Sequence, residues 1–277
     1  MYKGMEFADK VVWITGASSG IGEALARKIA ARGGRLVLSA RNREALDRVA
    51  ADCRESGASE VLVLPLDVSE HSSLEAAARQ VFAHFTHLDL LINNAGVSQR
   101  SFCIDTDFSV YQQMMNINVL GQIALTQAVL PAMLERGQGH IAVTASVAGK
   151  VGAPLRTGYC AAKHAVMGFF DALRTEVAAD GLEVTTITPG FIRTNVSKNA
   201  LGADGSPTGE TDEDIAGGMD VDECADVIVA GFESGNPEIA VGSGPEMSLL
   251  QLKRDDPIAA FRTLEGMAGQ IRERAKG

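Results

Sequence analysis

Blocks of apolar residues alternate with amphipathic blocks along most of the chain. Short apolar runs rich in Val, Ile and Leu recur at regular intervals and predict strands. The runs lie at residues 11–15, 36–39, 61–64, 88–92, 140–144, 184–188 and 239–241. Each interval up to residue 188 can hold a helix, and apolar and charged residues alternate at helical spacing in 24–31, 44–54 and 74–85.

A strand–helix–strand repeat predicts right-handed crossovers and a parallel sheet with helices on both faces. The predicted strands are apolar almost throughout, as strands covered on both faces must be. We therefore predict a single α/β domain over residues 1–277, with a doubly wound, Rossmann-type sheet of about seven strands.

One segment breaks this pattern. Residues 197–220 are rich in Gly, Asp, Ser and Thr and form either a mobile surface loop or a lid over a site. The segment follows the sixth predicted strand, on the side where open α/β sheets carry function, so we expect a mobile substrate lid. Residues 245–277 are expected to form a helical extension.

A glycine-rich loop, TGASSGIG, follows the first predicted strand at residues 15–22 and leads into a helix. Glycines allow a tight turn and a close approach to a pyrophosphate, and the helix offers unpaired N–H groups to the same anion. The spacing is G-x-x-x-G-x-G rather than G-x-G-x-x-G. We predict a dinucleotide held by Gly16, Ser18, Ser19, Gly20, Ile21 and Gly22.

The end of the second strand predicts which dinucleotide binds. An NAD site usually places a carboxylate there, on the ribose 2′-hydroxyl. This chain has Ala40 followed by Arg41, so no carboxylate repels a 2′-phosphate and a guanidinium is present to pair with one. We predict NADP(H) rather than NAD(H), the alternative being that Arg41 only begins a solvated helix face.

A tyrosine and a lysine, Tyr159 and Lys163, lie one helical turn apart. A free tyrosine has a pKa of about 10, and a nearby cation stabilises tyrosinate and lowers that pKa. We therefore expect Lys163 to lower the pKa of Tyr159, making it a general acid in reduction and a general base in oxidation. Ser146 ends the fifth strand, where its hydroxyl can hold a substrate oxygen.

The motifs of the chain, taken in order, resemble the short-chain dehydrogenases/reductases over about residues 10–194. They are TGASSGIG (15–22), LDV (66–68), NNAG (93–96), NVLG (118–121), Ser146, YCAAK (159–163) and PGFIRT (189–194). Residues 146–170, together with the ADG in the expected lid, look most like the subgroup that acts on hydrophobic ketones and alcohols.

The resemblance implies roles for individual residues. Asn118, Ser146, Tyr159 and Lys163 would form the catalytic set, with Asn118 relaying protons through water. The cofactor would lie against Asp67 and Val68 at the adenine, Asn94, Ala95 and Gly96 at the ribose, Tyr159 and Lys163, and Pro189, Gly190, Ile192 and Thr194 at the nicotinamide. A buried asparagine often only satisfies backbone groups, so that interpretation of Asn118 stays open.

Two departures from common patterns stand out. Many NADP-dependent relatives carry a basic residue inside the glycine loop, where this chain has Ser18 and Ser19, so the NADP(H) prediction rests on Arg41. Ala145 replaces a second serine that the subgroup often has beside Ser146, with no consequence for the catalytic set.

The loops after strands four to six should form the substrate walls. Their apolar residues predict a medium-sized hydrophobic carbonyl compound or secondary alcohol, while their basic residues either meet an acidic group or face solvent. These are Phe102, Val147, Val151, Leu155, Phe191, Val196 and Leu201, with Arg100, Lys150 and Arg156.

The function that competes with an oxidoreductase is a cofactor-binding sensor or regulator with a dormant site. A third candidate is a scaffold protein, which the glycine loop disfavours.

Charge and composition narrow the partners. A formal net charge of −10 argues against nucleic acid or an anionic membrane surface. The longest uncharged run, 109–134, contains six Asn or Gln side chains, so no transmembrane segment is expected. The four cysteines show no regular spacing and the five histidines no metal-ligand spacing, which predicts a reduced, cytoplasmic protein without a metal site.

The same uncharged run predicts self-association. A helix that covers a sheet should keep one polar face, and 109–134 carries no charge on any face. Ala161, Ala165, Gly168 and Ala172 form a stripe of small residues that allows another helix to approach. We expect a homodimer or homotetramer, unless the C-terminal helices at 257–275 cover this surface instead.

Overall fold

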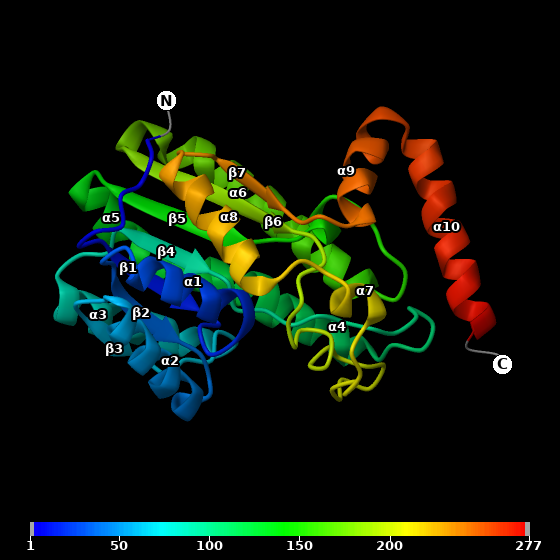
Figure 1. Cartoon of the computed structure of the whole chain (residues 1–277), viewed down its shortest axis with the longest axis horizontal. Helices are drawn as coiled ribbons and strands as arrows, with labels where there is room; N and C mark the ends of the chain where they lie inside the picture. The colour runs from blue at the N-terminus through cyan, green and yellow to red at the C-terminus, as the bar shows by residue number, and fades with distance from the viewer. Residues whose placement is uncertain (1–2, 275–277) are drawn as a thin grey trace.

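The computed structural model describes residues 3–274, so residues 275–277 of the expected C-terminal extension lie outside the described residues. Seven parallel strands form one sheet in the order β3-β2-β1-β4-β5-β6-β7 (Figure 1). Their bounds are β1 Val11–Thr15, β2 Arg35–Ser39, β3 Val61–Val63, β4 Leu90–Asn93, β5 Gly139–Thr144, β6 Leu182–Pro189 and β7 Glu238–Val241. The predicted doubly wound α/β fold is confirmed.

Helices cover both faces of the sheet. One face is covered by α1 (Gly20–Ala30), α2 (Arg43–Ser56) and α8 (Val221–Glu233), and the other by α3 (His71–Phe85), α5 (Gly121–Arg136) and α6 (Thr157–Val177). Outside these layers lie α4 (Phe108–Met115), α7 (Glu213–Ala216), α9 (Pro245–Asp255) and α10 (Pro257–Arg274). Figure 1 shows α10 standing at one end of the molecule, outside the two layers.

The strands are apolar on both faces because each face has its own core. In β1, Val12 and Ile14 pack with α1, α2 and α8, while Val11 and Trp13 pack with α3, α5 and α6. All four side chains are fully buried. Burying them on both sides of the sheet is worth about 1.5–3 kcal/mol for each large apolar side chain, which is why the strand sequence tolerates no polar alternation.

Local signals set the ends of the helices. The Asn42 side chain accepts a hydrogen bond from the Ala45 amide at 3.1 Å and caps α2, and Gly57, with a φ of +120°, ends it. The predicted single helix over 109–134 is interrupted by a π-helical turn at Asn116–Leu120 between α4 and α5. Such turns are rare and occur often at functional sites, and no sequence pattern considered above indicated this one.

One stretch of the described residues, Phe108–Arg136, is long and apolar enough to cross a membrane by length and composition alone. The core helix of a folded domain meets the same criterion, and side chains of this stretch, including Leu125 and Val129, pack into the core beside α3 and α6. The expectation of no transmembrane segment therefore still rests on the amide side chains in this run.

His140 at the start of β5 is a buried titratable group inside the fold. Its Nε2 atom lies 2.9 Å from Thr185 Oγ1, and its ring meets the Phe232 ring edge-on at 5.5 Å. Burial lowers the pKa of His140 to about 4, well below the 6.5 of a free histidine. The folded state therefore resists protonation at this position.

We predict that His140 makes the protein less stable in mild acid. Between pH 6.5 and about 4 the unfolded chain binds a proton at this position that the folded chain does not, so the free energy of unfolding falls as the pH falls. The expected loss is about 2 kcal/mol between pH 7.5 and pH 5. Urea denaturation of the wild type and of His140→Gln at both pH values measures it. The variant should lose about 2 kcal/mol less over this interval, and an equal pH dependence would contradict the prediction.

Candidate active site

The carboxyl ends of β1, β2, β4, β5 and β6 open onto one cavity of about 1250 Å³. Chain order reverses between β1 and β4, and ligands of open α/β sheets bind in the crevice at such a switch point. Loops after these strands, the segment 194–215 and both C-terminal helices contribute to the walls. The cavity is large enough for a dinucleotide with a further small molecule beside it.

The glycine loop has the backbone geometry that a pyrophosphate site requires. Gly16 and Gly20 have φ values of +68° and +58°, a region that other residues rarely adopt. A Cβ at Gly22 would lie 2.4 Å from the Gly16 carbonyl oxygen, so only glycine lets α1 begin this close to the loop. Ser19, the N-cap of α1, makes no side-chain bond to the first-turn amides. These residues therefore fit an anion at the α1 N-terminus.

The end of the cavity predicted to hold the adenosine is bordered by Arg41 after β2 and by Asp67 and Val68 after β3. Burial acts to raise the pKa of Asp67. The hydrogen bonds from Ser69 and the charge of Arg41 together outweigh burial, so the pKa of Asp67 lies below its usual value. The Arg41 side chain is exposed, and within residues 3–274 no carboxylate forms an ion pair with it. Its guanidinium is therefore positioned at the cavity edge without a fixed partner.

A chain of hydrogen bonds joins Lys163 to the glycine loop. The Lys163 ammonium donates to the Thr144 carbonyl at 2.7 Å, and the Thr144 hydroxyl donates to Asn94 Oδ1 at 3.1 Å. Asn94 Nδ2 donates to the Thr15 carbonyl at 3.0 Å. The Thr15 hydroxyl in turn accepts from the amides of Asn94 and Ala95, each at 3.0 Å. The ends of β1, β4 and β5 are thus held together directly beneath the cavity.

Tyr159 and Lys163 lie on α6 as predicted, with the ammonium 5.7 Å from the centre of the Tyr159 ring. The expected lowering of the tyrosine pKa is wrong for this structure. Burial raises the pKa of Tyr159, and the opposing effects of the Ser146 hydroxyl and of Arg156 are smaller. Burial also lowers the pKa of Lys163 to about 8. The physical reason is that desolvation disfavours both charged forms and is the largest effect on each group.

Ser146 lies just beyond β5 and caps the short 3-10 turn Val147–Gly149. Its Oγ atom accepts from the Ala148 amide at 3.1 Å and lies 3.4 Å from the Pro189 carbonyl oxygen. A hydrogen bond between the hydroxyls of Ser146 and Tyr159 lowers the tyrosine pKa against the larger effect of burial. The two hydroxyls therefore face the same small volume of the cavity.

Asn118 is fully buried in the π-helical turn and does not line the cavity. Its side-chain amide exchanges two hydrogen bonds of 2.9 Å with the backbone of Val97. A Cβ at Gly96 would lie 2.6 Å from Asn118 Oδ1 and 3.7 Å from the Lys163 ammonium, so all three groups are close. In this structure Asn118 satisfies backbone groups behind the site, the interpretation left open from the sequence.

Gly22 also lies behind the cavity rather than on its wall, at the close contact with Gly16 described above. The remaining predicted cofactor and catalytic residues all line the one cavity. They are Gly16, Ser18, Ser19, Gly20, Ile21, Arg41, Asp67, Val68, Asn94, Ala95, Gly96, Ser146, Tyr159, Lys163, Pro189, Gly190, Ile192 and Thr194.

All but two of the residues predicted for the substrate walls line the cavity. Phe102 packs under the Arg272 guanidinium at 5.1 Å, and Lys150 pairs with Glu238, so neither lines the cavity. The C-terminal helices add apolar residues that sequence reasoning did not assign to the site, because nothing local shows where α9 and α10 fold back. The walls contain Val147, Val151, Leu155, Phe191, Val196, Leu201, Leu249, Leu264, Met267 and Ile271.

The segment 197–220 folds down over the cavity. Its residue Asp212 is buried and accepts hydrogen bonds from Arg156, at 2.6 Å, and from Arg100. Arg156 also donates to the Ser98 hydroxyl at 3.1 Å. The two arginines that the sequence offered to an acidic substrate group therefore already share one carboxylate partner from this segment. The expected mobility of this segment stays a prediction.

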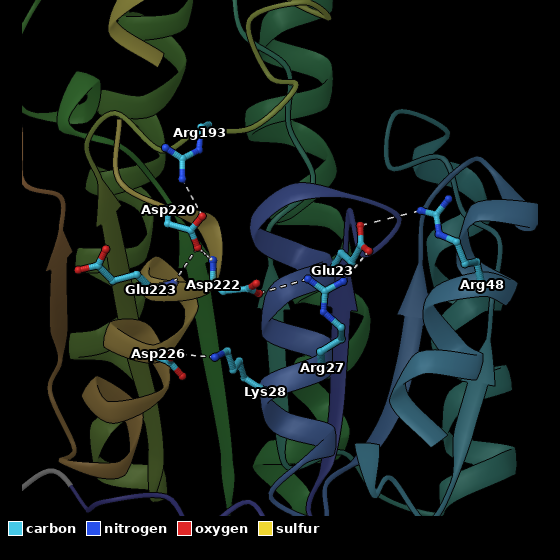
Figure 2. A network of polar contacts seen from close by, with 9 residues as sticks. All are labelled: Glu23, Arg27, Lys28, Arg48, Arg193, Asp220, Asp222, Glu223 and Asp226. Carbon is cyan, nitrogen blue, oxygen red and sulfur yellow. Dashed lines mark hydrogen bonds and ion pairs between the residues drawn. The ribbon is translucent and has the colours of Figure 1, made fainter. Parts of the chain in front are cut away.

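The loop that carries residues 189–194 is tied to neighbouring elements on two sides. Arg193 pairs with Asp220, the N-cap of α8, at 2.8 Å, and Arg27 of α1 pairs with Asp222 at 3.2 Å (Figure 2). Such exposed pairs contribute little energy individually. On the other side, buried Glu246 of α9 accepts from the Phe191 amide at 2.9 Å. α8 and α9 therefore fix the loop from both ends.

Comparison with known proteins gives the same family that the sequence motifs resemble. Residues 10–204 match the family model described as short chain dehydrogenase. The human protein "Dehydrogenase/reductase SDR family member 7" is 42% identical over 260 residues, which are 92% of this chain and 77% of that protein.

Two solved structures have the same fold. A short chain dehydrogenase/reductase from Burkholderia phymatum in complex with NAD superposes with a TM-score of 0.80 at 28% identity, over 91% of this chain and 95% of that one. An alcohol dehydrogenase from Thermococcus sibiricus complexed with 5-hydroxy-NADP gives a TM-score of 0.72 at 28% identity, over 84% and 96%.

Proposed function

The chain belongs to the short-chain dehydrogenase family, and from that premise we propose that this oxidoreductase transfers a hydride between NADP(H) and the carbonyl or secondary alcohol of a medium-sized hydrophobic molecule. One observation carries the proposal. Ser146, Tyr159 and Lys163 face the same cavity as a glycine loop with the backbone conformation of a pyrophosphate site. A regulator with a dormant site has no need of this complete set.

The bound nicotinamide cofactor supplies the hydride. The protein's own residues hold and move the proton. Ser146 donates a hydrogen bond to the substrate oxygen and keeps it beside the Tyr159 hydroxyl, and Tyr159 gives its proton to that oxygen in reduction or takes it in oxidation. Burial favours the protonated phenol, which suits the reductive direction. Lys163, fixed by the Thr144 carbonyl, holds a positive charge next to the ring.

Arg41 supports NADP(H) as the cofactor. Its exposed guanidinium lies at the adenosine end of the cavity, where it can pair with a 2′-phosphate. The solved relatives carry NAD in one case and an NADP derivative in the other, so the preference rests on Arg41 and on the absence of an acid at Ala40.

Apolar walls support the substrate class. The apolar side chains of Val147, Leu155, Leu201 and Met267 line the same cavity as Tyr159, and both nearby arginines are paired with Asp212. A neutral substrate loses little on entering such a pocket, whereas an anionic one would have to compete with Asp212.

We also propose a homo-oligomer. Ala161, Gly168 and Ala172 on α6 are exposed, and nothing lies within 4 Å of the position that a Cβ at Gly168 would take. Leu120 is exposed as well. The alternative was that the C-terminal helices cover this surface of the same chain. It loses support because α10 contributes Leu264 and Ile271 to the cavity wall.

We predict that Tyr159→Phe lowers the rate of ketone reduction by about 100-fold or more, because the substrate oxygen loses its proton donor. NADPH binding, followed by nucleotide fluorescence, should stay within about twofold of the wild type, since the ring is kept. A screen of hydrophobic ketones with NADPH, read at the absorbance of the reduced nicotinamide, provides the substrate. Undiminished turnover with bound cofactor would disprove the mechanism.

We predict that Arg41→Ala weakens NADPH binding by about tenfold or more and leaves NADH binding unchanged, because only NADPH carries the 2′-phosphate. Fluorescence titration with each nucleotide measures the ratio. Arg43→Ala is the matched control, since Arg43 is an exposed arginine two residues away that pairs with Asp47 at 3.7 Å. Equal weakening of both nucleotides, or none, would refute the NADP(H) preference.

A further inference from the structure

Tyr159 lies in the first turn of α6, where backbone amides lack partners within the helix. The N-cap residue of this helix, Arg156, makes no side-chain capping bond. A side chain from another part of the chain takes over that role. Gln99, in the loop after β4, accepts from the Gly158 amide at 2.7 Å and from the Tyr159 amide at 3.3 Å with the same Oε1 atom. The cap therefore comes from 60 residues away and binds the backbone of the proposed acid itself.

Gln99 is fixed on every side. It is fully buried, and its Nε2 atom donates to the hydroxyls of Ser101 and Thr106 at 3.2 and 3.3 Å. Both ends of the side-chain amide are thus satisfied, as a buried amide requires. Its main chain pairs with Leu201 of the segment over the cavity, and the flanking bond from the Leu201 amide to the Ser98 carbonyl is 2.8 Å.

The neighbouring glycine makes room for this contact. A Cβ at Gly158 would lie 2.8 Å from Gln99 Oε1 and 3.0 Å from the Tyr111 ring. The glycine before Tyr159 is therefore explained by the close approach of Gln99. Gln99 itself does not line the cavity, so its side chain touches neither substrate nor cofactor and reaches the phenol only through the backbone of α6.

We infer that Gln99 is a positioning residue for Tyr159, holding the first turn of α6 so that the phenol meets the substrate oxygen. The inference rests on the proposed function of Tyr159. Small displacements of a reacting group can cost large factors in rate. Here the buried side-chain amide of Gln99 joins the loop after β4 to the first turn of α6, and the main chain of Gln99 pairs with the segment over the cavity. Any change at Gln99 therefore acts on the phenol through the backbone.

Two substitutions separate the hydrogen bonds from the volume of the side chain. Gln99→Met keeps the length and removes the cap, so we expect kcat for ketone reduction to fall about tenfold with the KM for NADPH unchanged. Amide hydrogen exchange in residues 157–163 should rise about fivefold, the effect of losing one cap. Gln99→Glu keeps an acceptor for both amides and should restore most of kcat and of the exchange protection. Gln80→Met and Gln80→Glu, at an exposed position on α3, are the matched controls.

Tyrosine labelled with ¹³C at Cζ gives a readout that needs no turnover. The chain has three tyrosines, and Tyr159→Phe assigns the signal of Tyr159. The groups that face the phenol are Ser146, Arg156, Cys160 and Lys163, and a first turn that shifts when the cap is lost changes their distances to it. The titration midpoint of Tyr159 should therefore differ between Gln99→Met and the wild type, while neither Gln80 variant moves it.

The inference is overturned if folded Gln99→Met keeps the wild-type kcat, exchange and Tyr159 titration. Should Gln99→Met fail to fold, the same three measurements on Gln99→Leu, which also lacks the acceptor, decide instead. A wild type that reduces no carbonyl compound would sink the proposed function, whereas the exchange and the titration would still report whether Gln99 holds Tyr159.

Discussion

The site depends on one buried chain of hydrogen bonds, from Lys163 through Thr144 and Asn94 to Thr15. Adjacent strands of a parallel sheet twist apart, and a cavity at their ends would leave polar backbone groups without partners. The Asn94 side chain, just after β4, bonds to Thr15 at the end of β1 and to Thr144 at the end of β5, and the Thr144 carbonyl holds the Lys163 ammonium. The glycine loop and the α6 helix are thereby held at a constant separation, which hydride transfer between their ligands requires.

Burial affects the two titratable partners in opposite directions. It raises the pKa of Tyr159 and lowers that of Lys163 to about 8, because desolvation disfavours tyrosinate and ammonium alike. The phenol is therefore kept protonated before substrate arrives. The segment 197–220 places the buried carboxylate of Asp212 between Arg100 and Arg156, where it offsets one of their two positive charges.

Much of the fold was predictable because apolar periodicity and a glycine loop are local signals. The strands, the doubly wound sheet and the residues around the cavity followed from them and from the ordered motifs. Contacts between distant residues could not be predicted in this way: Gln99 caps a helix 60 residues away, and Asp212 pairs with Arg100. The π-helical turn that holds Asn118 also had no signal in the sequence. The pKa of Tyr159 was predicted in the wrong direction because spacing shows that a lysine is near but not that both groups are buried.

The central claim is that the dinucleotide loop and Tyr159 serve one hydride-transfer site. The most direct test is to reduce a hydrophobic ketone with NADPH that carries deuterium at both C4 positions and to analyse the alcohol by mass spectrometry. The account predicts one deuterium on the carbinol carbon for each NADPH consumed. Alcohol without deuterium, or NADPH consumption without alcohol across the whole ketone series, would contradict it.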